Sequence, residues 1–149
     1  MGCDIHSVAE RRADGKWEAI KGFAPFDWRS YGMFGFLANV RNYSAIPCIS
    51  EPRGLPDDSP FSEDHSDCDY HSGSWLSVDE LSAFDYEQEI EDRRVTRQVA
   101  PNMWSGAVTA EPGEGAKTTF REFLGEGFFD DLQKLKDIGA ERIVFCFDN

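Results

Sequence analysis

Residues 142–148 read Arg-Ile-Val-Phe-Cys-Phe-Asp, and this stretch sets the expected fold. Residues 143–147 are apolar without interruption, whereas a strand with one wet face would alternate apolar and polar side chains. A short continuous apolar run is typical of a strand that is buried on both faces. We therefore predict a central strand that ends at Asp148 and Asn149, at the edge line of the sheet where pockets are often built.

Two helices are predicted to precede this strand. The first begins at Thr118 or Thr119 and ends before Gly125. The second begins at about residue 128, and Gly139 takes the position just after its end. At the start of the chain, residues 3–12 and 16–22 are predicted to form a β-hairpin around Ala13-Asp14-Gly15. The last strand and the first hairpin should share one sheet.

The middle of the chain is less regular. Helical spacing predicts a helix over about 30–40, and Ser77 with Glu80 predicts a capped helix start. Residues 41–73 read as a long Pro-rich loop, in which 46–60 is stiff and 62–71 is a flexible insertion. Residues 86–99 are ambiguous between helix and strand, and residues 100–117 read as a second loop.

These elements predict an α+β fold with one domain over residues 1–149. Its mixed or antiparallel sheet combines the N-terminal hairpin with the buried C-terminal strand and is covered by helices. The 41–73 loop lies within it as a functional or partly flexible segment. A chain of 149 residues with 40% hydrophobic residues is long enough to bury a core.

Composition narrows the location and the partners. The net charge of −13 disfavours non-specific binding to nucleic acid, because basic residues supply that attraction. The amino-terminal residues lack the pattern of a signal peptide, and the longest apolar runs fall well short of 18 residues, so we expect a cytoplasmic protein without membrane contact. Its four cysteines form no Cys-x-x-Cys pair, which disfavours disulfides and zinc ribbons. A homo-oligomer is compatible with the sequence.

The first strand carries the first candidate site. Side chains alternate along a strand, so Asp4 and His6 should share one face while Cys3 takes the other. An acid beside an imidazole can set its tautomer and support acid–base chemistry. The alternative is that both are polar residues on a wet edge strand. Because Cys3 and His6 point apart, the pattern argues against a thiol enzyme.

The sequence resembles a family of small uncharacterised bacteriophage and prophage proteins. The resemblance rests on MGCDIH at the start, FGFLANVRNY at 34–43, ISEPRGLPDD at 49–58, HSGSWLSVDEL at 71–81 and RIVFCFDN at the end. Relatives often have HSHSWL where this chain has Gly73 in place of a second histidine. The resemblance implies a phage accessory protein in the cytoplasm of an infected bacterium, with a role such as counter-defence.

The matching segments are polar where a packing motif would be apolar, which favours a binding or catalytic site. Two histidines and two arginines suit phosphoester chemistry without a cofactor, because imidazoles move protons and guanidinium groups hold phosphate oxygens. We therefore predict His6 and His71 as acid and base, with Asp4 orienting His6. The predicted ligand-binding residues are Arg41, Asn42, Arg53, Ser72, Trp75, Asp148 and Asn149.

The leading hypothesis is a phosphodiesterase-like hydrolase that acts on a nucleotide or another phosphodiester. One alternative is a protein that sequesters a nucleotide signal without turnover, and another is an acidic nucleic-acid mimic that blocks a host factor. A weaker alternative is a divalent metal, either near Asp4 and His6 or held by Cys48, His65, Cys68 and His71. In the alternative without a functional site, the arginines pair with acidic residues and Trp75 belongs to the core.

Overall fold

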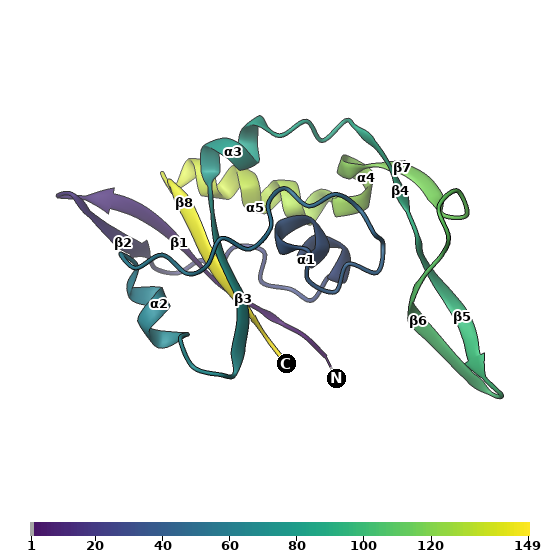
Figure 1. Ribbon diagram of the computed structural model, residues 1–149. Helices are drawn as coiled ribbons and strands as arrows, with labels where there is room; N and C mark the ends of the chain where they lie inside the picture. The colour runs from purple at the N-terminus through teal and green to yellow at the C-terminus, as the bar shows by residue number, and fades with distance from the viewer. Residues whose placement is uncertain (1) are drawn as a thin grey trace. The chain divides into compact units, whose positions relative to one another are not determined.

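The computed structural model describes residues 2–149, and their contacts gather in two units (Figure 1). The first unit combines the chain up to Arg29 with Pro52–Phe84 and Glu126–Asn149, and the second combines Ser30–Glu51 with Asp85–Gly125. Each unit is therefore assembled from segments that are distant in the sequence. None of the helices within residues 2–149 is long and apolar enough to cross a membrane.

The first unit is built on a four-stranded antiparallel sheet in the order β2-β1-β8-β3. These strands are β1 (Ile5–Ala13), β2 (Lys16–Ile20), β3 (Tyr70–Ser77) and β8 (Arg142–Asp148). The strand predicted from the apolar run at 143–147 is β8, which lies between β1 and β3, and its first six residues are buried. The predicted N-terminal hairpin is β1 with β2.

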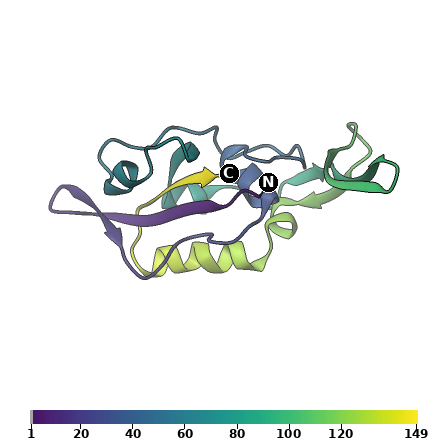
Figure 2. The same cartoon turned by 90° about the horizontal axis from the view of Figure 1, so that it is seen from below.

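Three helices belong to this unit: α2 (Pro60–Asp64), α3 (Val78–Ala83) and α5 (Glu126–Asp137). Figure 2 shows α5 along one face of the sheet and α2 on the opposite side. The buried side of α5 carries Phe128, Leu132 and Leu135, and the Phe128 ring stacks on Phe26 at 4.6 Å between centroids. The predicted Ser77–Glu80 capping box is present at the start of α3.

The second unit contains the helices α1 (Tyr31–Ala38) and α4 (Phe120–Leu124) and two separate two-stranded sheets. One sheet pairs β4 (Glu89–Asp92) with β7 (Ala116–Thr119), and the other pairs β5 (Arg94–Ala100) with β6 (Met103–Thr109). The Phe36 ring packs against Phe120 and Tyr86, which gives this unit its own aromatic core. The α+β prediction is thus confirmed, with every strand pair antiparallel.

One prediction for the middle of the chain was wrong, because residues 100–117 hold β6 and the start of β7 rather than a loop. Residues 62–71 contain the end of α2 and the start of β3, joined by a turn. The β5–β6 ribbon buries neither face against a helix, so its sequence lacks the alternation that marks a half-buried strand. The ambiguous residues 86–99 contain β4 and β5.

A buried ion pair ties β1 to β8. The Arg142 Nε donates to the Glu10 carboxylate at 2.8 Å, and the Glu10 side chain is 0% exposed. The second Glu10 oxygen accepts a hydrogen bond from the Ser59 hydroxyl at 2.6 Å. The Arg142 guanidinium also donates to the Asp58 carboxylate, and its carbon lies 3.8 Å from the Trp17 ring centroid. Such a pair is tolerated in the interior because both Glu10 oxygens have a hydrogen-bond donor and Arg142 bonds two carboxylates.

We predict that Arg142→Met destabilises the protein by about 3–5 kcal/mol, because it leaves the Glu10 carboxylate buried without a counter-charge. The matched control is Arg11→Met, since Arg11 forms an ion pair with Glu18 while both side chains are about half exposed. That change should cost less than about 1 kcal/mol. Urea unfolding of the two variants and the wild type measures both costs, and equal losses would contradict the assignment.

Candidate functional site

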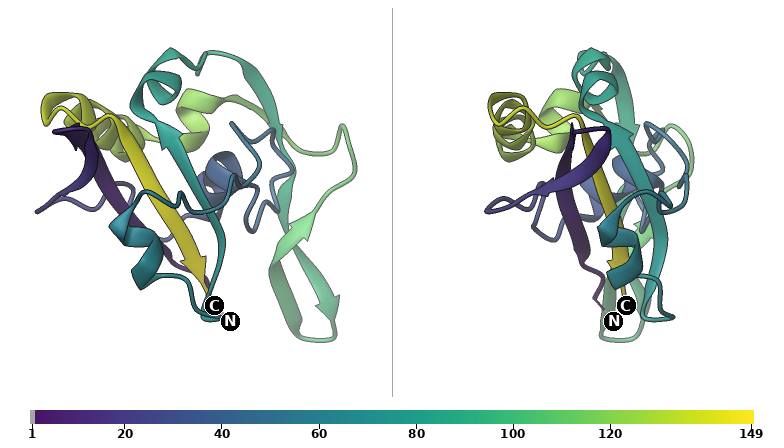
Figure 3. Two further views of the ribbon diagram at one scale, coloured as in Figure 1. Left: turned by 60° about the vertical axis from the view of Figure 1, so that its left-hand side comes forward. Right: turned by 90° about the vertical axis from the view of Figure 1, so that its left-hand side faces the viewer.

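The candidate site lies where the start of β1 meets the end of β8, two segments that Figure 3 shows side by side. The Asp4 backbone N–H donates to the Asp148 carboxylate, and the Asp148 N–H donates to the Asp4 carbonyl, both at 3.0 Å. His6 lies directly opposite Cys146 in the β1–β8 register. The pairing of these two strands therefore brings the first and last polar residues of the sheet together.

The His6 Nε2 lies 2.6 Å from the Asp148 Oδ2. This hydrogen bond, together with the Asp4 backbone N–H and the charge of His6, holds the pKa of Asp148 below its ordinary value near 3.8, so its carboxylate is ionised at neutral pH. An ionised carboxylate can only accept, so His6 donates from Nε2. In the neutral ring this leaves the Nδ1 lone pair available to take a proton.

A second imidazole lies beside the first. The centroids of the His6 and His65 rings are 5.9 Å apart, and His65 stacks on Phe61 at 3.8 Å. The His65 Nδ1 lies 2.9 Å from the Phe61 carbonyl, which can only accept, so Nδ1 carries the proton and Nε2 is left for a ligand. Each imidazole thus has one nitrogen held by the protein and one available.

Tyr70 completes the cluster. Its ring meets His6 edge-on at 5.2 Å and His65 at 4.8 Å between centroids. Loss of hydration, reinforced by nearby acidic groups that include Asp67, raises the pKa of the Tyr70 phenol. The hydroxyl therefore stays protonated at neutral pH and can donate a hydrogen bond to an anion. We call His6, His65, Tyr70 and Asp148 the imidazole cluster.

A hollow of about 250 Å³ lies beside the cluster. Burial, with the neighbouring Asp148 and Asp67 carboxylates, raises the pKa of the Cys146 thiol in its wall to about 12, so this thiol is not a nucleophile at neutral pH. Cys3 and Cys146 are both buried. The hollow is lined by Leu55, His65, Ser66, Asp67, Tyr70, His71, Gly73 and Cys146.

A larger hollow of about 400 Å³ lies beside Trp17, at the turn of the first hairpin. Its lining contains arginine, lysine, aspartate and glutamate but neither histidine nor cysteine. That wall therefore lacks an imidazole, the side chain that most often transfers protons in catalysis. The hollow beside the imidazole cluster is therefore the better candidate for catalysis.

The carboxylate that orients His6 is Asp148 and not Asp4. Asp4 instead accepts two hydrogen bonds from the Arg29 guanidinium, at 2.9 and 2.8 Å, and this pairing lowers its pKa. Sequence spacing brought Asp4 and His6 to one face but could not show which acid would be bonded to the imidazole. Asp148 had been predicted only as a ligand-binding residue.

His71 is placed differently from His6. It lies opposite Phe147, whereas His6 lies opposite Cys146, and consecutive residues of β8 point to opposite faces of the sheet. The His71 ring is instead held by the Ser72 hydroxyl at 2.9 Å and the Asn149 side chain at 3.0 Å. The structure therefore groups His71, Ser72 and Asn149, and it pairs His6 with His65.

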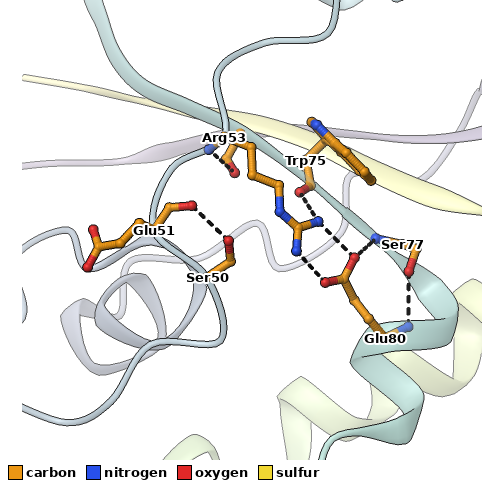
Figure 4. A network of polar contacts seen from close by, with 7 residues as sticks. Ser50, Glu51, Arg53, Trp75, Ser77 and Glu80 are labelled. Atoms are coloured by element: carbon orange, nitrogen blue, oxygen red, sulfur yellow. Dashed lines mark hydrogen bonds and ion pairs between the residues drawn. The ribbon is translucent and has the colours of Figure 1, made fainter.

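Arg53 and Trp75 form a separate network with Glu80 (Figure 4). The Arg53 guanidinium donates to both Glu80 oxygens, at 2.9 and 2.5 Å, and to the Trp75 carbonyl at 3.1 Å. Its carbon lies 4.6 Å from the Trp75 ring centroid, so it stacks on the indole. The arginine predicted as a phosphate clamp and the tryptophan predicted to stack on a base are engaged with each other.

Arg41 and Asn42 belong to the second unit. The Asn42 amide closes the loop after α1, since it donates to the Asn39 side chain and the Ile46 carbonyl and accepts from the Ile46 N–H. Its side chain also fills the space that a Cβ on Gly35 would enter. Arg41 lies over the Tyr31 ring at 5.5 Å. Asn42 thus has a structural role.

Within residues 2–149, no three histidine, cysteine, aspartate or glutamate side chains are grouped so that they could hold a metal ion. Of the four residues suggested as zinc ligands, Cys48 is placed beside Glu51 at 3.7 Å, Cys68 is exposed, and His65 and His71 make the contacts given above. A divalent metal therefore stays a prediction without an assembled site.

Sequence reasoning missed Tyr70 and the position of His65 beside His6, because it treated their segment as a flexible insertion. The signal was present in Ser59-Pro60, since serine at the cap and proline at the first helical position mark a helix start. That helix, α2, presents His65 at its C-terminal end.

Comparisons with protein-family models, with curated proteins and with solved structures find no match to this chain. The fold and the site therefore define the protein only as an α+β protein with a carboxylate-supported pair of imidazoles beside a small hollow.

The Arg53–Glu80 pair predicts a pH dependence of stability. The Arg53 guanidinium, with bonds from Ser77, lowers the pKa of Glu80 below its ordinary value of 4.5. A depressed carboxyl pKa stabilises the fold at pH values above that ordinary value, and the gain is lost as the pH falls through the lowered pKa. Wild type should therefore be more stable than Glu80→Gln at pH 7.

Thermal unfolding from pH 7 to pH 3 measures this difference, which should shrink steadily below about pH 4.5. The control is Glu87→Gln, because Glu87 forms an ion pair with Arg121 in which both side chains are at least half exposed. That variant should stay close to wild type throughout. A Glu80→Gln difference that does not change with pH would contradict the assignment.

Proposed function

We propose that the protein is a hydrolase that acts on a phosphodiester of the nucleotide class, with His6 and His65 as its acid–base pair. The observation that carries the proposal is the arrangement of the two rings, whose centroids are 5.9 Å apart. Each ring has one nitrogen fixed by a protein acceptor and the other available. Two imidazoles held in this way can take a proton on one side of a phosphorus centre and return one on the other.

In this reaction, the His6 Nδ1 removes a proton from the attacking water as its oxygen bonds to phosphorus. The protonated His65 donates from Nε2 to the leaving oxygen as its bond to phosphorus breaks. Asp148 keeps His6 in the required tautomer and stabilises the imidazolium that forms. The Tyr70 hydroxyl donates to a non-bridging oxygen, where negative charge accumulates. Proton exchange with solvent restores both imidazoles.

Charge favours a diester over a monoester. The wall of the hollow contains Asp67, and Asp148 lies beside His6. Two arginines of the first unit, Arg29 and Arg53, already bind the carboxylates of Asp4 and Glu80. Binding of phosphate then depends on an imidazolium and a phenol, which suits the single charge of a diester better than the double charge of a monoester.

The resemblance to bacteriophage and prophage proteins supplies the context of the proposal. A phage accessory protein that removes a nucleotide in the cytoplasm of its host would act on a small ligand, and the hollow of about 250 Å³ is small. Cyclic and linear nucleotide diesters are therefore the substrates to test first.

Incubation with a panel of cyclic and linear nucleotides, followed by mass spectrometry, tests the proposal directly. We predict that one diester is consumed, and that His6→Asn and His65→Asn each lower kcat by about 10²- to 10⁴-fold while KM changes little. The comparison variant is His71→Asn, because His71 also lines the hollow but has both ring nitrogens engaged, by Ser72 and Asn149, so this change can alter KM without removing a proton carrier. It should keep kcat within a few-fold of wild type.

Other outcomes have defined meanings. A nucleotide that co-purifies unchanged would indicate that the protein sequesters the nucleotide and does not hydrolyse it. Loss of turnover in His71→Asn but not in His65→Asn would restore the acid–base pair predicted from the sequence. If no nucleotide is bound or consumed, and His6→Asn is stable and unchanged, the cluster is structural.

A further inference from the structure

The β5–β6 ribbon of the second unit is positively charged, although the chain as a whole is acidic. The chain has a net charge of −13, yet residues 93–110 contain Arg93, Arg94 and Arg97 and no aspartate or glutamate. These residues form the β5–β6 ribbon and its flanks. Because a ligand responds to the charge close to it, this ribbon can attract an anion that the rest of the chain would repel.

The ribbon also exposes apolar side chains near its turn. Val99 is 54% exposed, Met103 is 59% exposed and Trp104 is 65% exposed. Large aromatic rings are rarely left in water to this extent without a function, because their burial is strongly favourable. An exposed indole beside arginines offers a flat surface on which a planar group can stack.

Trp104 shares a face of the ribbon with an arginine. Residues two apart on a strand point to the same side, so Trp104 and Gly106 lie on one face, roughly 7 Å apart. The Arg94 Nε donates to the Gly106 carbonyl at 2.6 Å, and an atom of its guanidinium lies 3.9 Å from the place that a Cβ on Gly106 would take. Because Gly106 has no side chain, this residue does not separate the Trp104 indole from the Arg94 guanidinium.

Arg94 also packs against two tyrosine rings. The Arg94 guanidinium carbon lies 5.5 Å from the Tyr31 ring centroid and 5.6 Å from that of Tyr43, and Arg41 lies 5.5 Å from Tyr31. The two tyrosine rings are 6.1 Å apart. Arg94, Tyr43, Tyr31 and Arg41 therefore form a run of basic and aromatic groups in contact, and Trp104 is exposed on the Arg94 face of the same ribbon. We call these five residues the arginine–aromatic track.

The arginines of the ribbon are not neutralised by acidic partners. Among residues 2–149, the ion pairs do not include Arg94 or Arg97. Most of the other arginines do bind a carboxylate, as Arg29, Arg53 and Arg142 illustrate. In a chain with 28 acidic residues and 15 basic ones, two arginines without a carboxylate keep their full charge for a ligand.

We propose that the arginine–aromatic track binds single-stranded nucleic acid. Single strands are held by basic groups that contact phosphates and by aromatic side chains on which bases stack, and the track supplies both in alternation. A duplex fits less well, because its stacked bases leave no free face for Trp104. An apolar protein partner would use Val99 and Met103 but would leave the guanidinium groups without counter-charges.

The direct test is fluorescence anisotropy of a labelled oligothymidine of about 16 nucleotides, titrated with the full chain. We expect binding at about 50 mM salt, which weakens roughly 7-fold at about 200 mM salt if the two arginines of the track contact phosphates. A labelled duplex of the same length should bind more weakly. Equal or tighter binding to the duplex would overturn the assignment to single strands.

Variants separate stacking from other contributions. Trp104→Ala should weaken binding by roughly 5- to 150-fold, and Trp104→Phe should restore most of it because a phenyl ring also stacks. Met103→Ala is the control for exposed apolar surface, since Met103 is the exposed neighbour that points to the other face. It should leave the affinity within about twofold. Equal losses in both alanine variants, or no rescue by phenylalanine, would favour a protein partner.

Charge is tested in the same way. Arg94→Gln should weaken binding and reduce the dependence of log K on log salt by about 0.7. The matched control is Arg11→Gln, which removes the same charge from the first unit, where Arg11 pairs with Glu18. Wild-type protein that binds no oligonucleotide at low salt would overturn the proposal. So would an Arg11 variant that loses as much affinity as the Arg94 variant.

Discussion

The pairing of β8 with β1 on one side and β3 on the other is the constraint on which the first unit depends. β8 has no wet face, and its side chains from Arg142 to Phe147 are all buried. Its antiparallel register places Cys146 opposite His6, and Asp148 opposite Tyr70. A slip of one residue would reverse the face of every side chain on the strand, so hydrophobic burial fixes the position of the polar cluster as well.

This strand pairing also places charged groups of β1 and β8 so that each meets a partner. The Glu10–Arg142 pair holds β1 and β8 together toward one end of the sheet, while Asp148 and His6 are bonded at the other. His65 reaches the cluster from the C-terminal end of α2, whose cap, Ser59, is also bonded to Glu10. The buried ion pair and the imidazole cluster are therefore linked through one short helix and two strands.

Much of the fold follows from the sequence because its signals are local. The apolar run of β8, the first hairpin, the capping box at Ser77 and the end of the last helix at Gly139 were all predicted and are present. β6 was missed and β5 was ambiguous between helix and strand, because neither face of this ribbon is buried. The imidazole cluster was only half predicted, since the partner of His6 lies 142 positions away and only strand register brings it near.

The net charge of the whole chain likewise differs from the charge of one of its segments. A net value of −13 predicts poor binding to nucleic acid, yet the arginines of residues 93–110 lie in a segment without acids. Local composition would have revealed this segment. It would not have shown that Arg94 lies over Tyr31 and Tyr43, because those contacts join residues about 50 to 60 positions apart.

The central claim is that Asp148 and the Phe61 carbonyl fix the two imidazoles in opposite tautomers. Long-range nitrogen–proton correlation by NMR distinguishes the two ring nitrogens of each histidine. In the neutral rings, the account predicts a proton on Nε2 of His6 and on Nδ1 of His65, with the His6 preference lost in Asp148→Ala. A proton on Nδ1 of His6, or a His6 tautomer that is unchanged in Asp148→Ala, would contradict it.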